Sequence, residues 1–344
     1  MKGSLRIALV FALLGCTSVA QETATQDRKN LTAAELEEQI LTWIKYLEIP
    51  ERRDAVIRDL RRVGAPAVAL LRAAAQAEVK RGRTDVHQAL LQALYPIEAK
   101  RLAGLPVDEA VTIIADYSEN RVAVVDATGQ KLLAFENIIG AWDAELTPTG
   151  TFLISEFSRN RVFELDREGN ELWSVNDLKN PYDADRLSNG NTLIADTFNR
   201  RVIEVDPEGV IVWSYAKDVH PYDADRLPNG NTLIANVLND NVIEVDPEGE
   251  IVWEVKGVPH VHDADRLPSG NTLLTIRMLH EVREVNAAGE TVMSLKNLVS
   301  PSDADRLPNG NTLVAENRHV REFNPTGKEV SRIVVTWSVE ANRY

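Results

Sequence analysis

The spacing of apolar residues along the chain changes after residue 103. Between Leu31 and Ala103 apolar residues recur about every 3.6 positions, which predicts amphipathic helices. Thr32 and Glu35 have the spacing of a capping box ahead of the first of these helices. A few helices cannot form an extended stack of repeats. We therefore expect residues 31–103 to form a small helical cap that packs on its neighbour.

After Leu105 the chain changes to short segments rich in alternating apolar and polar residues, which is typical of β-strands. Each repeat contains four strand candidates, joined by turn sequences such as Asn229-Gly230 and Asp246–Gly249. Four strands in about 40 residues is the size of one propeller blade. The string "DADRLPNGNTL" recurs with changes in five repeats. Its first aspartate falls every 40 residues, at Asp143, Asp183, Asp223, Asp263 and Asp303.

Five complete repeats and one partial repeat predict a mainly β fold. We expect a six-bladed β-propeller over residues 104–344, preceded by the small α-helical domain. The partial repeat, Thr112–Phe135, lacks its first strand. The C-terminal sequence "VVTWSVEANRY" is a candidate for that missing strand, and its pairing with the partial repeat would close the ring.

The first 20 residues predict an export signal and not a part of the fold. The basic stretch "MKGSLR" precedes the apolar run Ile7–Leu14, which is too short to span a bilayer. The following "LLGC" resembles a bacterial lipobox, in which Cys16 would become the lipidated N-terminus. Cleavage after Ala20 is the alternative. Residues 21–30 would form a linker, and we expect an envelope protein of the periplasm or outer membrane, attached to a membrane only through its lipid.

Composition and charge exclude several classes of function. A net charge of −14 argues against nucleic acid as a partner, since nucleic-acid binding requires a basic surface. Cys16 is the one cysteine of the sequence, so the folded part has neither a disulfide nor a thiolate metal site. We expect a monomer that requires no cofactor and has a small-molecule or polymeric ligand, or an envelope protein, as its partner.

The repeated Asp and Arg residues have a structural interpretation and a metal-binding one. Side chains alternate along a strand, so Asp225 and Arg226 should face different neighbouring blades and form Asp–Arg pairs around the ring. The ring of Asp143, Asp183, Asp223, Asp263 and Asp303 would converge on the channel mouth. Those carboxylates need either backbone N–H groups or a cation to offset their repulsion, which makes a central calcium ion the alternative.

Strand order places the repeated turns on one face of the disc and the loops that differ between blades on the other. The repeated face is expected to be architectural, and the variable face to hold any site for an asymmetric ligand. Candidate ligand-binding residues on the variable face are Trp142, Tyr182, Tyr222, His220, His260 and Arg318.

The stretches "HDADRLPSGNTLL" (His262–Leu274) and "NGNTLIADTFNRRVIEVDPEGVIVW" (Asn189–Trp213) resemble repeats of arylsulfotransferase-like propellers and, more distantly, NHL repeats. The likeness covers about 230 residues and implies six blades. It also implies that a funnel histidine, here His262, could accept a sulfuryl group. Arg277 with His280 or His319 would then stabilise the developing charge.

Two functional hypotheses follow. The first is a binding module of the cell envelope, since the variable loops lack a complete catalytic set. The alternative is an arylsulfate sulfotransferase-type enzyme that uses His262, Arg277, His280 and His319.

Overall fold

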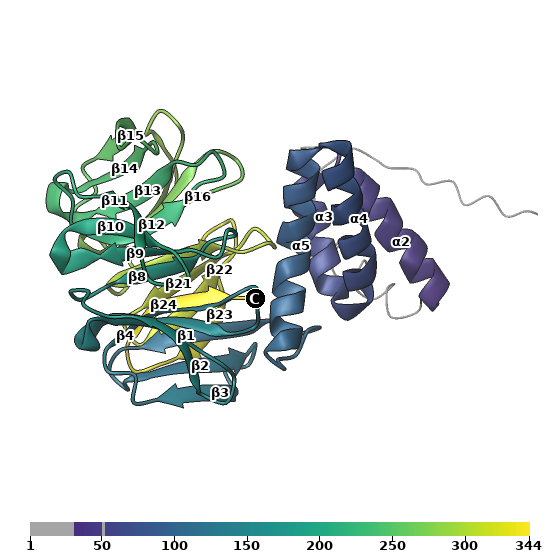
Figure 1. Ribbon diagram of the computed structural model, residues 1–344, viewed down its shortest axis with the longest axis horizontal. Helices are drawn as coiled ribbons and strands as arrows, with labels where there is room; N and C mark the ends of the chain where they lie inside the picture. Colours follow the sequence, from purple (N-terminus) through teal and green to yellow (C-terminus); the bar gives the residue numbers. More distant parts are fainter. Residues whose placement is uncertain (1–30, 50–51) are drawn as a thin grey trace, which may run out of the picture.

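The computed structural model describes residues 31–49 and 52–344, which form two parts (Figure 1). The first part consists of helices α2 (Ala33–Tyr46), α3 (Arg53–Val63), α4 (Val68–Arg81) and α5 (Thr84–Leu102). The predicted capping box is present at α2, where the Thr32 N–H donates to the Glu35 carboxylate at 2.8 Å. Within the described ranges no helix is long and apolar enough to cross a membrane. The predicted export signal, the linker and Cys16 lie outside the described residues.

The second part consists of six four-stranded antiparallel sheets, each of which is one blade. Blade 1 contains β24 (Ser338–Arg343), β1 (Val111–Asp116), β2 (Arg121–Asp126) and β3 (Lys131–Glu136). Blade 2 contains β4 (Ala141–Leu146), β5 (Phe152–Glu156), β6 (Arg161–Leu165) and β7 (Glu171–Val175). Blade 3 contains β8 (Asp183–Arg186), β9 (Thr192–Asp196), β10 (Arg201–Val205) and β11 (Ile211–Tyr215). Blade 4 contains β12 (Pro221–Arg226), β13 (Thr232–Asn236), β14 (Asn241–Val245) and β15 (Ile251–Lys256). Blade 5 contains β16 (Val261–Arg266), β17 (Thr272–Ile276), β18 (Glu281–Val285) and β19 (Thr291–Leu295). Blade 6 contains β20 (Pro301–Arg306), β21 (Thr312–Glu316), β22 (His319–Phe323) and β23 (Glu329–Val334).

The C-terminal strand closes the ring of blades. β24 pairs antiparallel with β1, and Thr112 lies opposite Arg343. Beyond the ends of these strands, Val111 and Tyr344 exchange backbone hydrogen bonds of 3.1 and 2.9 Å. The predicted six-bladed propeller and the predicted role of the C-terminal segment are both confirmed. Closure gives blade 1 its innermost strand, so that all six blades contain four strands and both ends of the propeller chain meet in one sheet.

The core lies between neighbouring blades. All residues of the second strands, such as Thr232–Asn236 in blade 4, are buried. Leu233 and Ala235 of blade 4 belong to one apolar cluster with Leu274 and Ile276 of blade 5. Each blade therefore buries its apolar side chains against the next blade, so a single repeat could not bury its apolar surface alone.

The arginine of each repeated string joins two blades, but its partner differs from the one expected. Arg226 donates through Nη2 to Glu204 on β10 of blade 3 at 2.8 Å, and its guanidinium lies 4.6 Å from the centre of the Trp213 ring. The expected Asp–Arg pairing is therefore wrong. Arg226 reaches outward to the third strand of the preceding blade, whereas Asp223 and Asp225 lie on the channel side. The equivalent pairs are Arg186–Glu164, Arg266–Glu244, Arg306–Glu284 and Arg343–Glu322.

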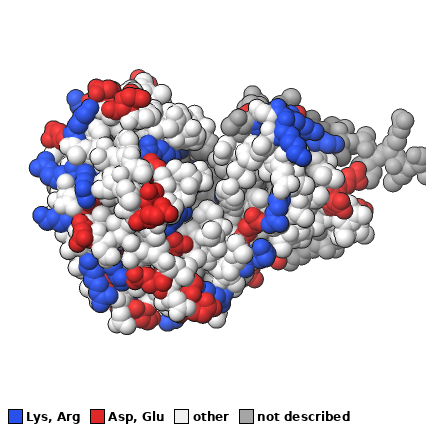
Figure 2. Space-filling view, in the orientation of Figure 1, with Lys and Arg blue, Asp and Glu red and all other residues white. Residues whose placement is uncertain are grey.

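The helical part packs on the face of the disc that carries the repeated turns (Figure 1). Ala103, just beyond α5, belongs to one apolar cluster with Phe152 of blade 2, and its carbonyl accepts a 2.6 Å hydrogen bond from Arg167. Gly150 has φ +82°, and a Cβ there would lie 2.5 Å from that of Leu102. The end of α5 thus packs closely against blade 2 of the propeller. Figure 2 shows acidic and basic side chains interspersed over the visible face of the propeller.

Candidate functional site

The variable face is formed by the loops between second and third strands and by the crossovers between blades. In four of the blades the loop contains a short 3-10 turn that is followed by a residue with positive φ. In several blades the side chain of that residue accepts a backbone N–H from the next crossover, as Asn160 does from Asn180 at 2.9 Å. These bonds hold the loops against each other and fix the rim of the channel.

A continuous arc of aromatic rings lies at the channel mouth on this face. Tyr182 stacks on Tyr222 with ring centres 4.1 Å apart, and Trp142 lies 4.1 Å from Tyr182. The arc continues from Tyr222 to His262 at 4.9 Å in one direction. In the other direction it passes through Tyr117, 5.4 Å from Trp142, to Trp337, 5.0 Å further. The structure therefore brings together the predicted residues Trp142, Tyr182 and Tyr222. Tyr117 and Trp337 extend the arc.

His262, His260 and Arg277 meet at one end of the arc. The His262 Nε2 and the His260 Nδ1 are 3.1 Å apart, which is a hydrogen bond with one ring as donor. Burial, then Arg277, then His260 hold the pKa of His262 well below its usual range. Burial followed by Arg277 also lowers the pKa of His260, so both rings are neutral at pH 7.

Arg277 supplies the positive charge of this cluster. Its Nη1 donates to the carbonyl of Ser300 at 3.1 Å, a neutral partner. Burial lowers the pKa of Arg277, and the nearby Tyr182 and Tyr222 oppose that shift. A guanidinium stays protonated in proteins at neutral pH, so the cluster presents a half-buried cation beside aromatic rings.

The remaining candidate residues of this face make their contacts with groups other than His262. His280 accepts the Ser300 N–H at 3.2 Å through Nδ1, which is the bridging role that Asn160 has in blade 2. His319 begins β22, where its Nε2 lies 3.5 Å from Arg332 on the outer strand. His220 packs edge-on against Tyr222, with ring centres 5.7 Å apart. Arg277 is thus the one member of the expected set Arg277, His280 and His319 that the structure places beside His262.

Arg318 lines a hollow at the boundary of blades 6 and 1. The hollow has a volume of about 480 Å³, and Ser118, Asn317, Thr336 and Trp337 also line it. Because Trp337 is also the last ring of the aromatic arc, the hollow and the arc form one continuous surface.

The channel itself is lined by carboxylates, and backbone groups neutralise the ring at its variable-face end. The N–H of the next blade's alanine donates to each aspartate of that ring, as Ala264 does to Asp223 at 3.0 Å. The other bonds are Ala184 to Asp143, Ala224 to Asp183, Ala304 to Asp263 and Ala341 to Asp303. Of the two interpretations of the aspartate ring, the one in which backbone N–H groups offset the repulsion fits this geometry.

Burial and mutual repulsion further reduce the charge in the channel. Burial raises the pKa of Asp263 to about 8 and that of Glu145 to about 7. Burial and then the neighbouring carboxylates raise the pKa of Asp223 well above its usual range. Several channel carboxyls therefore hold protons at neutral pH. Within the described part of the chain, no group of three or more His, Cys, Asp and Glu side chains is arranged to hold a metal ion.

Sequence reasoning missed the glutamate that pairs with each arginine, although its signal was present. Glu164, Glu204, Glu244 and Glu284 stand in the third-strand candidates with the same period of 40 as the arginines. Their pairing with arginine was hidden because it crosses from one blade to the next. The stacking of rings from several blades depends on side-chain rotamers, for which the sequence carries no signal.

The fold and the site define a six-bladed β-propeller with a helical cap. No family model and no curated protein matches the chain. Among solved structures, a protein of unknown function from Bacteroides caccae is similar, with TM-score 0.59 and 16% identity over 68% of this chain and 98% of that one. Virginiamycin B lyase from Staphylococcus aureus has TM-score 0.51 and 12% identity over 64% of this chain and 80% of its own. A functionally unknown protein from Desulfotomaculum acetoxidans has TM-score 0.51 and 11% identity over 66% of this chain and 98% of its own. At these identities the likeness establishes the propeller fold, and the arylsulfotransferase-like resemblance is not confirmed.

Proposed function

We propose that the protein is a non-catalytic binding module of the cell envelope and that its ligand binds on the variable face. The observation that carries this proposal is the arc of rings from Trp337 to His262, contributed by five blades. Trp142, Tyr222 and Trp337 are half-buried and so retain accessible surface. Aromatic side chains offer large apolar contact area at low entropic cost, which suits the binding of a flat ring.

The charge beside the arc indicates which ligands would bind best. Arg277 is bonded to a carbonyl, so its positive charge is available to an anionic group. His260 and His262 are neutral and can donate or accept hydrogen bonds without adding charge. We therefore propose that the ligand combines a flat apolar ring with an anionic substituent.

The arrangement around His262 favours binding over sulfuryl transfer. The His262 side chain is buried, and its Nε2 shares a hydrogen bond with His260. His280 has a bridging role in the rim, and His319 contacts Arg332. Stabilising charge on a transferring group requires several donors aimed at one point, and here Arg277 stands alone beside the two rings.

Titration with paired probes tests the binding proposal. We expect 2-naphthalenesulfonate to quench the tryptophan fluorescence and to bind at least about tenfold more tightly than the neutral 2-naphthol. Arg277→Gln should abolish this difference, and Tyr222→Ala should weaken both probes. Arg332→Gln, on an outer strand, is the matched control and should change neither affinity. Equal affinity of the two probes for the unmodified protein would contradict the proposed role of Arg277.

Attachment to the membrane is proposed from the sequence alone. The "LLGC" motif supports lipidation of Cys16 after export. Metabolic labelling with an alkyne fatty acid should mark the protein, and Cys16→Ser should remove the label and release the protein from the membrane fraction. Labelling that persists in the Cys16→Ser variant would contradict the anchor.

A further inference from the structure

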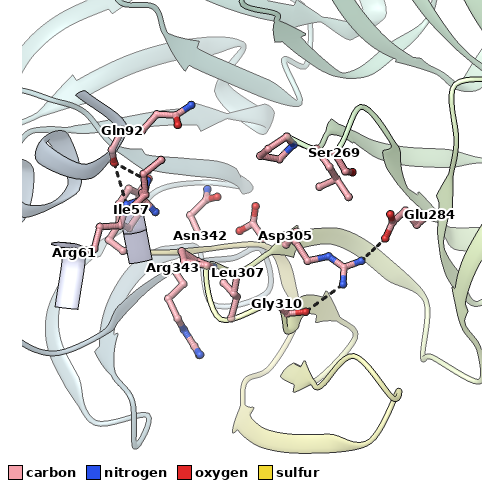
Figure 3. A pocket seen from close by; sticks show the side chains of 15 residues that line it. Ile57, Arg61, Gln92, Ser269, Glu284, Asp305, Leu307, Gly310, Asn342 and Arg343 are labelled. Atoms are coloured by element: carbon pink, nitrogen blue, oxygen red, sulfur yellow. Dashed lines mark hydrogen bonds and ion pairs between the residues drawn. The ribbon is translucent and has the colours of Figure 1, made fainter. Parts of the chain in front are cut away.

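A separate cavity lies on the opposite face of the disc, between the helical part and the propeller (Figure 3). Its volume is about 600 Å³, within the range of known ligand sites. Ile57 and Arg61 of α3 and Gln92 of α5 form the wall on the helical side. The other wall consists of the first turns of blades 5 and 6 and of parts of β18, β20 and β24. It includes Leu267, Glu284, Asp305, Arg306, Leu307 and Arg343.

Two of the arginines in this cavity are neutralised by the inter-blade pairs. Arg306 donates to Glu284 at 2.8 Å and to the Gly310 carbonyl at 3.3 Å, as Figure 3 shows. Arg343 pairs with Glu322 and donates through Nε to Thr112 at 3.0 Å. These arginines belong to the framework of the ring and leave little charge for a ligand.

Arg61 and Asp305 differ from these arginines because neither forms an ion pair with any other residue that the structure describes. Arg61 donates through Nε and Nη2 to the Gln92 carbonyl, at 3.0 and 2.8 Å. Burial lowers the pKa of Arg61 to about 10. Burial followed by repulsion from Asp225 raises the pKa of Asp305 to about 6, although Arg343 opposes that shift. Both groups are still charged at pH 7. They have opposite signs and come from opposite walls of the cavity (Figure 3).

A second cation strengthens the positive end. Lys100 lines a smaller adjoining recess of about 210 Å³, together with Arg61 and Arg343. Its Nζ donates to the carbonyl of Glu109 at 3.0 Å, a neutral partner, and to the backbone oxygen of Tyr344 at 3.5 Å. Burial lowers the pKa of Lys100 to about 8. The charge of Arg61 lowers it as well, although Asp108 opposes the shift. An anion beside Arg61 would relieve the repulsion between these two cations.

We infer that this cavity binds a short peptide as a zwitterion, with the ligand's carboxylate at Arg61 and its ammonium group at Asp305. The cavity supplies one unpaired charge of each sign, which is what the two ends of such a ligand require. Ile57, Leu267 and Leu307 offer apolar contact to its side chains. A cavity of about 600 Å³ exceeds the needs of a single amino acid and suits two or three residues. This inference does not depend on the ligand proposed for the variable face.

Calorimetric titration of the full chain with three related probes tests the inference without any mutation. The probes are leucyl-leucine, its N-acetyl derivative and its C-terminal amide. We expect leucyl-leucine to bind, and each capped form to bind at least about tenfold more weakly, because each leaves one charged group of the cavity without its partner. Equal affinity for a capped form would overturn the zwitterion, and no binding of leucyl-leucine at millimolar concentration would overturn the site.

Two substitutions assign the ends of the ligand. Arg61→Met should weaken leucyl-leucine at least about tenfold and leave the affinity for the amide unchanged, because the amide has no carboxylate. Asp305→Asn should weaken leucyl-leucine similarly and leave the N-acetyl form unchanged. Arg277→Gln on the variable face is the control and should not change binding. Thermal unfolding establishes that each variant is folded, and Arg61→Lys, which keeps the charge, should restore part of the affinity. If Arg61→Met weakened the binding of leucyl-leucine and of its amide to the same extent, the assignment of the ligand's carboxylate to Arg61 would be overturned.

Discussion

Replacing Arg226 with methionine removes one of the connections between blades 3 and 4. The guanidinium donates to Glu204 at 2.8 Å and to the Gly230 carbonyl at 3.0 Å, and it covers the Trp213 ring at 4.6 Å. Methionine keeps much of the apolar stem and loses all three contacts. Glu204 then keeps only the amide groups of Asn189 and Asn191, at 3.2 and 2.6 Å.

The expected loss of stability follows from the burial of this pair. Removing one partner of a buried ion pair costs about 3–5 kcal/mol, because the other charge stays buried without compensation. The Arg226 and Glu204 side chains are 17% and 12% exposed, so solvent offsets part of that cost. The two asparagine amides offset another part. The lost contact with Trp213 adds about 0.5–1 kcal/mol. We expect Arg226→Met to lower the free energy of unfolding by about 3 kcal/mol.

Urea unfolding of a double-mutant cycle measures this quantity. The cycle consists of Arg226→Met, Glu204→Gln and the double variant, whose loss should be clearly smaller than the sum of the single losses. Lys256→Met is the matched control, because Lys256 forms an exposed pair with Glu254 at 3.1 Å on the outer strand of blade 4. It should cost less than about 1 kcal/mol. If Arg226→Met cost no more than this control, or if the cycle were additive, the reasoning about the inter-blade pair would be refuted.

Three further predictions concern the channel and the variable face. The pKa of Asp263 is about 8 in the folded state, above that of an unfolded carboxyl, so its contribution to stability is present below about pH 4 and is lost as the pH rises towards 8. Asp263→Asn keeps an oxygen for the Ala304 N–H, and calorimetry should show a gain in Tm near pH 9 but not near pH 4. Since the alanine N–H groups neutralise the aspartate ring, EDTA should leave Tm unchanged, and a drop that calcium restores would disprove this account. Incubation with an aryl sulfate and a phenol acceptor should give no turnover in the unmodified protein or in His262→Ala; turnover lost in His262→Ala would instead support the enzyme.

The number of blades and the closure of the ring could be predicted because both follow from local sequence patterns. A type of turn recurs with each repeat, as at Asn229-Gly230, and the strands between turns alternate in polarity. The partial repeat Thr112–Phe135 lacks one strand, and the C-terminal segment contains one strand more than it needs. Counting strands was therefore sufficient to predict the pairing of β24 with β1.

The contacts between blades could not be predicted in the same way. Alternation along the strand assigned Asp225 and Arg226 to opposite faces correctly, but it carries no information about how far a side chain reaches. Arginine is long enough to pass the neighbouring innermost strand and pair with Glu204 on the third strand. Aspartate is short and bonds with the nearest N–H, as Asp223 does with that of Ala264.

The face that the sequence marked as architectural owes its cavity to the helical part. Its turns are closely similar in blades 3 to 6, so a bare ring would present nearly the same surface at each of these blades and could not orient an asymmetric ligand there. The end of α5 packs beside blade 2, where Gly150 makes room for Leu102, while α3 and α5 stand over blades 5 and 6. Arg61 and Gln92 thereby face one part of the repeated surface and make it unlike the others. Sequence periodicity cannot predict such a site, because one of its walls comes from residues outside the repeats. In repeat proteins with a cap of this kind, we infer that unpaired charges at the junction indicate a ligand site as much as the variable loops do.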